Sequence, residues 1–192
     1  AASLHWSPLT AISARVPHDL LCWLAEPGML TARVRALCGP AMEFRRLGGL
    51  RDSALSTPLR ERLQVDDETC LLRDVEFCAS GERIVFAQTV LPASTLGHYP
   101  WLHELGDSPL GEALRQVDAP LEREPLEYAE LPAGHPLAEA ARVVTGDASM
   151  WARRAVYRLG GLPILVQEVF LPGLLRVQAP ARSRTEEHTL AA

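Results

Sequence analysis

The sequence has few of the features that are typical of membrane or nucleic-acid-binding proteins. Its 192 residues contain no run of about 18 apolar residues and no charged-then-apolar signal peptide. We therefore expect no membrane insertion and a cytoplasmic location. The net charge is −5 at pH 7, whereas proteins that mainly bind nucleic acid are usually basic. We expect no nucleic-acid partner.

Cysteine is also scarce. Cys22, Cys38, Cys70 and Cys78 form no C-x-x-C pair, and three of the four fall in apolar segments. This pattern favours buried, reduced thiols over metal ligands or disulfides. We therefore expect no metal site.

The composition itself is that of a folded protein. Hydrophobic residues make up 47% and charged residues 22% of the chain, which excludes disorder for most of its length. The length suits one domain with a sizeable core. Beyond Pro172 the periodicity is lost, so we predict a single domain over residues 1–179 and a flexible tail over residues 180–192.

Two predicted β-hairpins dominate the secondary structure. Thr69 to Cys78 and Arg83 to Leu91 alternate between polar and apolar residues around a turn that contains Gly81. Trp151 to Leu159 and Ile164 to Leu171 flank Gly160-Gly161 in the same way. A further strand is predicted over Ala41 to Leu47, and a weaker one in REPLEYAEL.

Short helices separate these strands. PHDLLCWLAEPG carries leucines at helical spacing before a Pro-Gly stop, and LPAGHPLAEAARVV is a weaker helical segment. Thr31, Thr57 and Ser108 are predicted N-caps, the last two each followed by a proline at the first helical position. Strands and helices together predict an α+β domain built on an antiparallel sheet.

Two charged side chains lie on otherwise apolar strand faces. Glu168 shares its face with Ile164, Val166 and Phe170, and Arg73 repeats the anomaly in the first hairpin. A buried charge costs several kcal/mol unless it is compensated. The two side chains either pair with each other, face solvent, or line a pocket in which Arg73 binds a ligand carboxylate.

Two helix starts are further candidates for binding an anion, because the first N–H groups of a helix are unpaired. These starts are Leu30-Thr31 and the segment Ser108 to Gly111. Ordinary capping is the commoner explanation for each of them.

Several sequence blocks resemble the chorismate pyruvate-lyase family. The matching blocks are LLRDVEFCASGERIVFAQTVLPASTL, LGDSPLGEAL and MWARRAVYRLGGLPILVQEVFLP, with MLTARV as a weaker fourth. The Leu121 to Ser149 region and the tail do not match. The resemblance implies an antiparallel sheet with helical flaps that cover an internal ligand site.

The resemblance also implies a function and a set of site residues. The enzyme would be a lyase that converts chorismate to 4-hydroxybenzoate and pyruvate, the first step of ubiquinone synthesis, as a monomer and without a cofactor. Arg73 and the backbone N–H groups of Leu110 and Leu30 would bind the aromatic carboxylate. Glu168 would lie at the far end of the site, as a base or as a hydrogen-bond partner of the ring hydroxyl.

Other polar residues are secondary candidates. Arg153 and Arg154 are candidates for binding the enolpyruvyl carboxylate, although a solvated strand end is the alternative. Gln88 and Gln167 depart from the family pattern, and we expect them to change the polarity of the pocket. His98, His103 and His135 are expected at the surface.

A different class of function has to be weighed against the lyase. Effector-binding domains of one family of bacterial transcription regulators share the fold that the resemblance implies and also bind small acids. Such a sensor usually carries a DNA-binding module, and no basic recognition helix is evident in the roughly 60 residues that precede the first hairpin. A partner-binding module would instead keep Arg73 and Glu168 as an internal ion pair.

Overall fold

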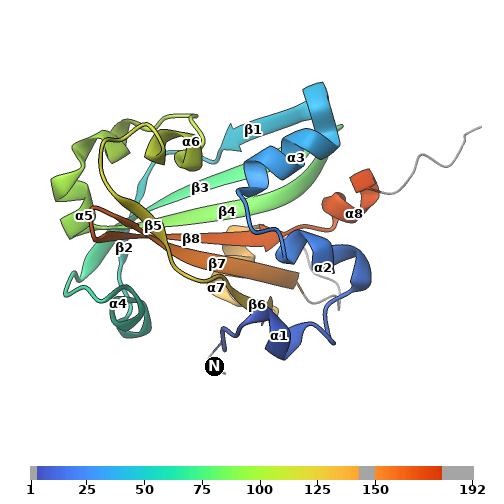
Figure 1. Ribbon diagram of the computed structural model, residues 1–192, viewed down its shortest axis with the longest axis horizontal. Coiled ribbons are helices and arrows are strands. Elements are labelled where there is room, and N and C mark those ends of the chain that lie inside the picture. Colours follow the sequence, from blue (N-terminus) through green and yellow to red (C-terminus); the bar gives the residue numbers. More distant parts are fainter. Residues whose placement is uncertain (1–3, 143–149, 179–192) are drawn as a thin grey trace, which may run out of the picture.

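The computed structural model describes residues 4–142 and 150–178, which form one antiparallel sheet covered by short helices (Figure 1). The strand order is β1-β3-β4-β8-β7-β5, with β2 also paired to β3 and β6 to β7. The strands are β1 (Met42–Arg46), β2 (Arg51–Ala54), β3 (Thr69–Ala79), β4 (Glu82–Pro92), β5 (Leu121–Arg123), β6 (Glu127–Leu131), β7 (Met150–Leu159) and β8 (Leu162–Phe170). This confirms the predicted α+β class.

The two predicted hairpins form the centre of the sheet. Strands β3 and β4 are joined at Ser80-Gly81, and β7 and β8 at Gly160-Gly161, with positive φ at all four turn residues. Positive φ at both positions matches the right-handed twist of the flanking strands and favours glycine. Strands β4 and β8 then pair with each other, so the hairpins make a continuous four-stranded core.

Helices cover both faces of this core. We call the face that carries Arg73, Val75 and Glu168 the flap face, and the one that carries Asp74, Gln88 and Gln167 the reverse face. The flap-face elements are α1 (Leu9–Ile12), α2 (His18–Leu24), α3 (Leu30–Cys38), α5 (Ala93–His98), α6 (Leu110–Leu114), α8 (Gly173–Gln178) and two 3-10 turns, η1 (Gly39–Ala41) and η2 (Pro100–Glu104). Helices α4 (Thr57–Leu63) and α7 (Pro136–Ala140) pack apolar side chains against the reverse face.

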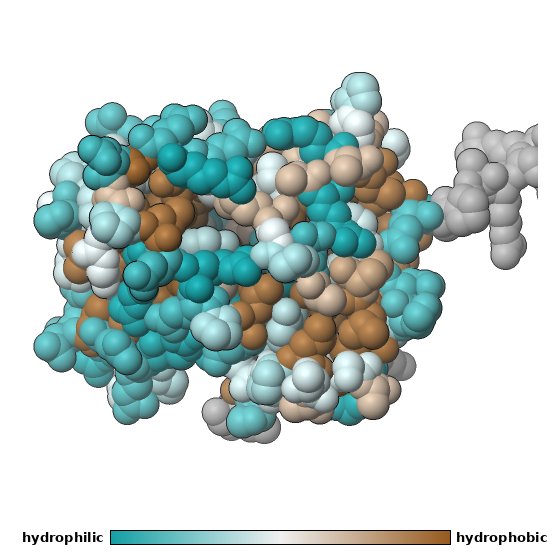
Figure 2. Space-filling view, in the orientation of Figure 1, coloured by the Kyte–Doolittle hydropathy of each residue, from teal (hydrophilic) through white to brown (hydrophobic). Residues whose placement is uncertain are grey.

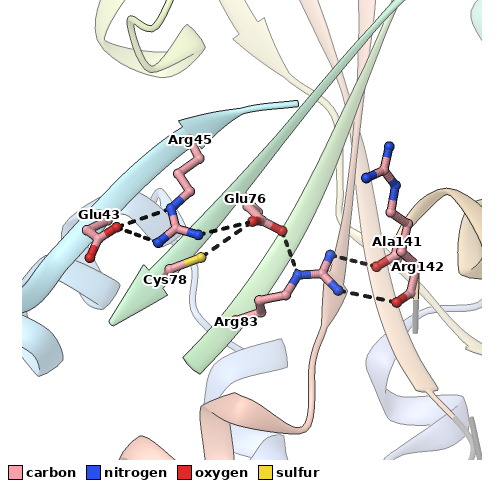
Figure 3. A network of polar contacts seen from close by, with 7 residues as sticks. All are labelled: Glu43, Arg45, Glu76, Cys78, Arg83, Ala141 and Arg142. Atoms are coloured by element: carbon pink, nitrogen blue, oxygen red, sulfur yellow. Dashed lines mark hydrogen bonds and ion pairs between the residues drawn. The ribbon is translucent and has the colours of Figure 1, made fainter. Parts of the chain in front are cut away.

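The reverse face buries acidic side chains of β3. Glu76 is 5% exposed, and its carboxylate accepts a 2.7 Å hydrogen bond from Nε of Arg83, with Arg45 3.9 Å away (Figure 3). The same Arg83 donates to the carbonyls of Ala141 and Arg142, just past α7. Burial and the nearby Glu76 raise the pKa of the Cys78 thiol to about 11. This network joins the sheet to the end of α7.

Several local predictions need correction. Strands β2 and β5 were not predicted, because each is a short edge strand. Helix α8 occupies the segment after Pro172 where periodicity is lost, and it buries Leu174 against the core. The predicted N-caps Thr57 and Ser108 are wrong by one position and Thr31 by two, since Ser56, Pro109 and Met29 precede the helices. The predicted tail lies outside the described residues.

The cysteines and the surface complete the description. All four cysteines are free; Cys70 and Cys78 are buried as predicted, but Cys22 is exposed on the outer side of α2. In the part of the chain that the structure describes, no helix is both long and apolar enough to cross a membrane. Hydrophilic residues and hydrophobic patches are interspersed on the side seen in Figure 2.

Candidate functional site

A cavity lies between the flap face of the sheet and the helices α3 and α6. About 60 Å³ of this cavity is open to water-sized molecules, which is less than the roughly 300–1,000 Å³ of typical small-molecule sites. Its charged lining residues are Arg73, Arg153 and Glu168, and Tyr157 and Thr89 add hydroxyls. The other lining residues are mostly apolar: Met29, Leu30, Thr31, Phe44, Val75, Phe77, Ala87, Pro109, Leu110, Gly111, Leu114 and Val166.

Strand register places the charged groups at two ends of this cavity. Arg73 is opposite Thr89, whereas Glu168 is opposite Ala87 on β4 and opposite Arg153 on β7. Arg73 and Glu168 therefore point from the same face, with β4 between their strands. Two inter-strand spacings separate their backbones by about 10 Å, enough for a small ligand between them.

Arg73 is buried without a carboxylate partner. Arg73 is only 2% exposed, and its Nη2 donates to the carbonyls of Ser108 at 2.7 Å and Gly106 at 3.0 Å. Nε is buried with no hydrogen-bond partner among the described residues. Burial lowers the pKa of Arg73, and the neighbouring Arg46 acts in the same direction. A buried cation with an unpaired donor is suited to an anionic ligand.

Glu168 pairs with Arg153 at the other end. Arg153 Nε lies 2.5 Å from Glu168 Oε2, and its Nη1 donates at 2.7 Å to the carbonyl of Glu26, beyond the end of α2. The Arg153 residue is 2% exposed. The alternative that Arg73 and Glu168 neutralise each other is therefore wrong, and so is a solvated strand end for Arg153. Glu168 is compensated by its own cross-strand neighbour, and Arg73 is not.

The flap helices begin at the cavity. Leu30 and Leu110 are the first residues of α3 and α6, so their N–H groups have no partner within the helix. The two flaps touch each other: a Cβ on Gly111 would collide with the terminal methyl of Met29. Both predicted backbone donors thus line the cavity, and their role in binding stays a prediction.

Comparisons with known proteins identify the relatives of this chain. The family model described as chorismate lyase matches residues 2–179. The chain is 37% identical over 166 residues to a probable chorismate pyruvate-lyase of Thiobacillus denitrificans, covering 84% of this chain and 87% of the relative. A protein of the same description from Methylococcus capsulatus is 38% identical, with 83% and 98% covered. The chain belongs to the chorismate lyase family.

Solved structures share the fold of this chorismate lyase family member. The effector domain of PhnF from Mycobacterium smegmatis matches with a TM-score of 0.53 at 18% identity, over 76% of this chain and 89% of that chain. The C-terminal domain of histidine utilization repressor from Pseudomonas syringae matches at 0.54 and 12%, over 68% and 92%. At these identities the likeness shows the fold alone.

Three other polar candidate residues lie outside the flap-face cavity. Arg154, Gln88 and Gln167 are on the reverse face and contact a different cavity, so the expectation that the two glutamines change the polarity of the ligand pocket is wrong. Gln167 is the neighbour of Glu168 along β8 and therefore points to the opposite face, and Gln88 and Arg154 are paired with Gln167 across the sheet.

The histidines and one tyrosine complete the assignment. His98 and His103 are exposed, as predicted, whereas His135 is half-buried and its Nδ1 accepts from the N–H of Leu137 at the start of α7. The sequence reasoning missed Tyr157, which lines the cavity; burial and the nearby Glu168 raise its pKa. Tyr157 lies two residues beyond Ala155 and four beyond Arg153 on β7, so the three residues share a face. This spacing could have identified Tyr157 as a cavity residue. Among the described residues, no cluster of His, Cys, Asp and Glu could hold a metal ion.

Proposed function

We propose that this protein is a chorismate pyruvate-lyase that produces 4-hydroxybenzoate and pyruvate in the cavity beneath α3 and α6. The observation that carries the proposal is Arg73, a buried cation with an unpaired Nε, which lines the cavity beneath the flaps in a member of the chorismate lyase family. Relatives over most of the chain bear the description probable chorismate pyruvate-lyase.

In this proposal the ring carboxylate binds at the Arg73 end. The guanidinium of Arg73 comes from the sheet, and the N–H groups of Leu110 and Leu30 lie at the starts of the two flap helices. The carbonyls of Ser108 and Gly106 already fix Nη2. The remaining donors of Arg73 are then oriented before the substrate arrives, which reduces the entropy lost on binding.

The opposite end of the cavity would bind the ring hydroxyl and the second carboxylate. Because Oε2 of Glu168 accepts from Arg153, Oε1 is the oxygen that remains for the hydroxyl of the substrate. Arg153 supplies the second positive charge among the cavity-lining residues, and we assign the enolpyruvyl carboxylate to it. The two substrate carboxylates are then matched by two guanidinium groups.

The reaction requires no added atoms. The bond from the ring carbon to the enolpyruvyl oxygen breaks, the neighbouring ring carbon loses its proton, and the enolpyruvyl methylene gains one, giving 4-hydroxybenzoate and pyruvate. Formation of the aromatic ring drives the step, so the protein mainly orients the substrate and excludes water. A concerted cyclic transfer needs no protein base. Glu168 is then assigned to holding the hydroxyl, with proton removal as the alternative.

The resemblance supplies the wider context of the proposal. The product would enter ubiquinone synthesis in the cytoplasm, and no cofactor would be needed. A small-acid-sensing domain is the competing function, and it would bind organic acids without turnover.

One experiment separates the two functions. Purified protein is mixed with chorismate, and the ultraviolet absorbance of 4-hydroxybenzoate is followed beside Arg73→Ala. Product above the spontaneous rate from the wild type alone supports both the activity and the site. Absence of product would exclude the lyase, and equal activity of Arg73→Ala would exclude the assigned site.

A further inference from the structure

A continuous row of polar side chains crosses the reverse face of the sheet. Backbone register aligns Asp74, Gln88, Gln167, Arg154 and Glu127 on β3, β4, β8, β7 and β6. The first three residues are each 8% exposed, and the Arg154 side chain is 11% exposed. Burial of so many polar groups is costly unless each has a hydrogen-bond partner.

Hydrogen bonds connect the row in two halves. Gln88 Nε2 donates to Asp74 at 3.0 Å, and Gln167 Nε2 is 3.4 Å from the Gln88 oxygen. In the other half, Arg154 Nε donates to Glu127 at 3.0 Å. Between the halves, Oε1 of Gln167 and the terminal nitrogens of Arg154 have no partner among the described residues. An amide acceptor and a set of cationic donors, on residues paired across β8 and β7, thus remain available at the cavity that both residues line.

These unpaired groups face a second cavity. Strands β3, β4, β7 and β8 form its floor, and its walls come from α4, α7 and the segment around Trp6. Among its described lining residues there are two arginines, Arg51 and Arg154, and no Asp or Glu. The carboxylates that pair with these arginines, Asp74 and Glu127, are not among the residues that line the cavity.

The walls of this second cavity also suit a ligand with a flat, apolar ring. The Trp6 ring stacks on the Arg154 guanidinium at 4.4 Å, while Leu72 and Val90 provide apolar floor. Cationic donors, one amide acceptor and an aromatic wall are the complement of a carboxylate, a hydroxyl and a ring.

We propose that the reverse-face cavity is a second ligand site that binds a hydroxylated aromatic acid. Arg154 binds its carboxylate, Gln167 Oε1 accepts from its hydroxyl, and Trp6 covers its ring. The sheet separates this site from the flap-face cavity, because side chains of neighbouring strand residues point to opposite faces. A ligand at this site contacts the same strands, β7 and β8, that carry Arg153 and Glu168.

The test is a binding measurement that needs no turnover. The indole N–H resonance of Trp6, assigned with Trp6→Phe, is followed by NMR during titration with 4-hydroxybenzoate in the Arg73→Ala background, where the flap-face site is weakened. We expect a saturable shift, with affinity about tenfold weaker for benzoate, which lacks the hydroxyl, and for phenol, which lacks the carboxylate. Because the flap-face site is impaired, the result is separate from the proposed lyase activity.

Variants of the row provide the controls. Gln167→Leu and Gln167→Glu should each weaken binding about tenfold or more, the second by neutralising Arg154. The exposed Gln116→Leu is the matched control and should bind as its parent does. If the chemical shift of the Trp6 indole N–H does not change at millimolar 4-hydroxybenzoate, the proposal is wrong. Equal binding by Gln167→Glu, which preserves the side-chain shape, would overturn the assigned contacts.

Discussion

Replacing Arg73 by methionine should strongly lower activity without unfolding the protein. Among the described residues that line the cavity, Arg73 is the charged one at its end, and truncating a buried charge that binds an opposite charge costs about 2–5 kcal/mol. This corresponds to a fall of roughly 30- to 5,000-fold in kcat/KM. The loss should be measured with chorismate, by following the absorbance of 4-hydroxybenzoate.

The stability of the same variant follows from the contacts of Arg73. Methionine removes two hydrogen bonds from a charged donor, each worth about 1.5–3 kcal/mol, to the carbonyls of Ser108 and Gly106. It also removes the desolvation penalty of a buried cation that has no carboxylate partner, which is several kcal/mol. The two contributions are of similar size, so the free energy of unfolding should change by about 1 kcal/mol or less.

Arg153→Met is the matched comparison, because it leaves a carboxylate without its partner. Glu168 is paired at 2.5 Å, and its side chain is 16% exposed, so breaking the pair should cost about 3 kcal/mol, the low end for buried pairs. Urea unfolding of both variants measures the difference. An Arg73→Met protein that is destabilised as much as Arg153→Met, or that keeps wild-type kcat/KM, would refute this account of the site.

Three further predictions concern the flaps, Glu168 and the edge of the sheet. Glu168→Gln should lower kcat/KM about tenfold, mainly through KM, whereas a fall in kcat of about 100-fold or more would assign proton removal to Glu168. Gly111→Ala should displace Met29 and weaken 4-hydroxybenzoate binding by up to about tenfold, with recovery in the double variant Met29→Ala/Gly111→Ala, as measured by calorimetry. Burial alone would raise the pKa of Glu127, but hydrogen bonds from Arg62 and Arg154 outweigh it and lower the pKa below 4.5. The stability that ionised Glu127 contributes through these bonds is therefore present above pH 4.5 and is lost as pH falls further. The destabilisation caused by Arg62→Met should accordingly shrink in urea titrations below that pH, and an undiminished difference in acid would exclude this coupling.

Strand alternation predicted much of the site because the face of each side chain follows from its neighbours in the sequence. Arg73 and Glu168 stood out as charges on apolar faces, and both line one cavity. The partner of Glu168 was not predictable with the same certainty. Arg153 lies near the start of its strand, where a solvated charge is common, and only the register of β7 against β8 places it directly opposite Glu168.

The sequence did not reveal which sides of the sheet are covered by helices. Asp74 and Glu76 fit a polar, solvent-facing side of β3, yet both are buried. The short helices α4 and α7 cover that side, and a five-residue helix such as α7 carries too little periodicity to reveal its packing. Helix α8 was missed for the same reason, although it buries Leu174 completely.

The two faces of the sheet handle buried charge in different ways. On the reverse face, each carboxylate of the polar row has an arginine partner, as in Asp74 with Arg51 and Glu127 with Arg154. On the flap face Glu168 is paired with Arg153, whereas the hydrogen bonds of Arg73 among the described residues go to carbonyls. A positive charge that the fold itself does not neutralise is favoured only when something else supplies the anion. This asymmetry points to Arg73 as the residue whose positive charge serves the ligand, while the arginines of the reverse face also serve the fold.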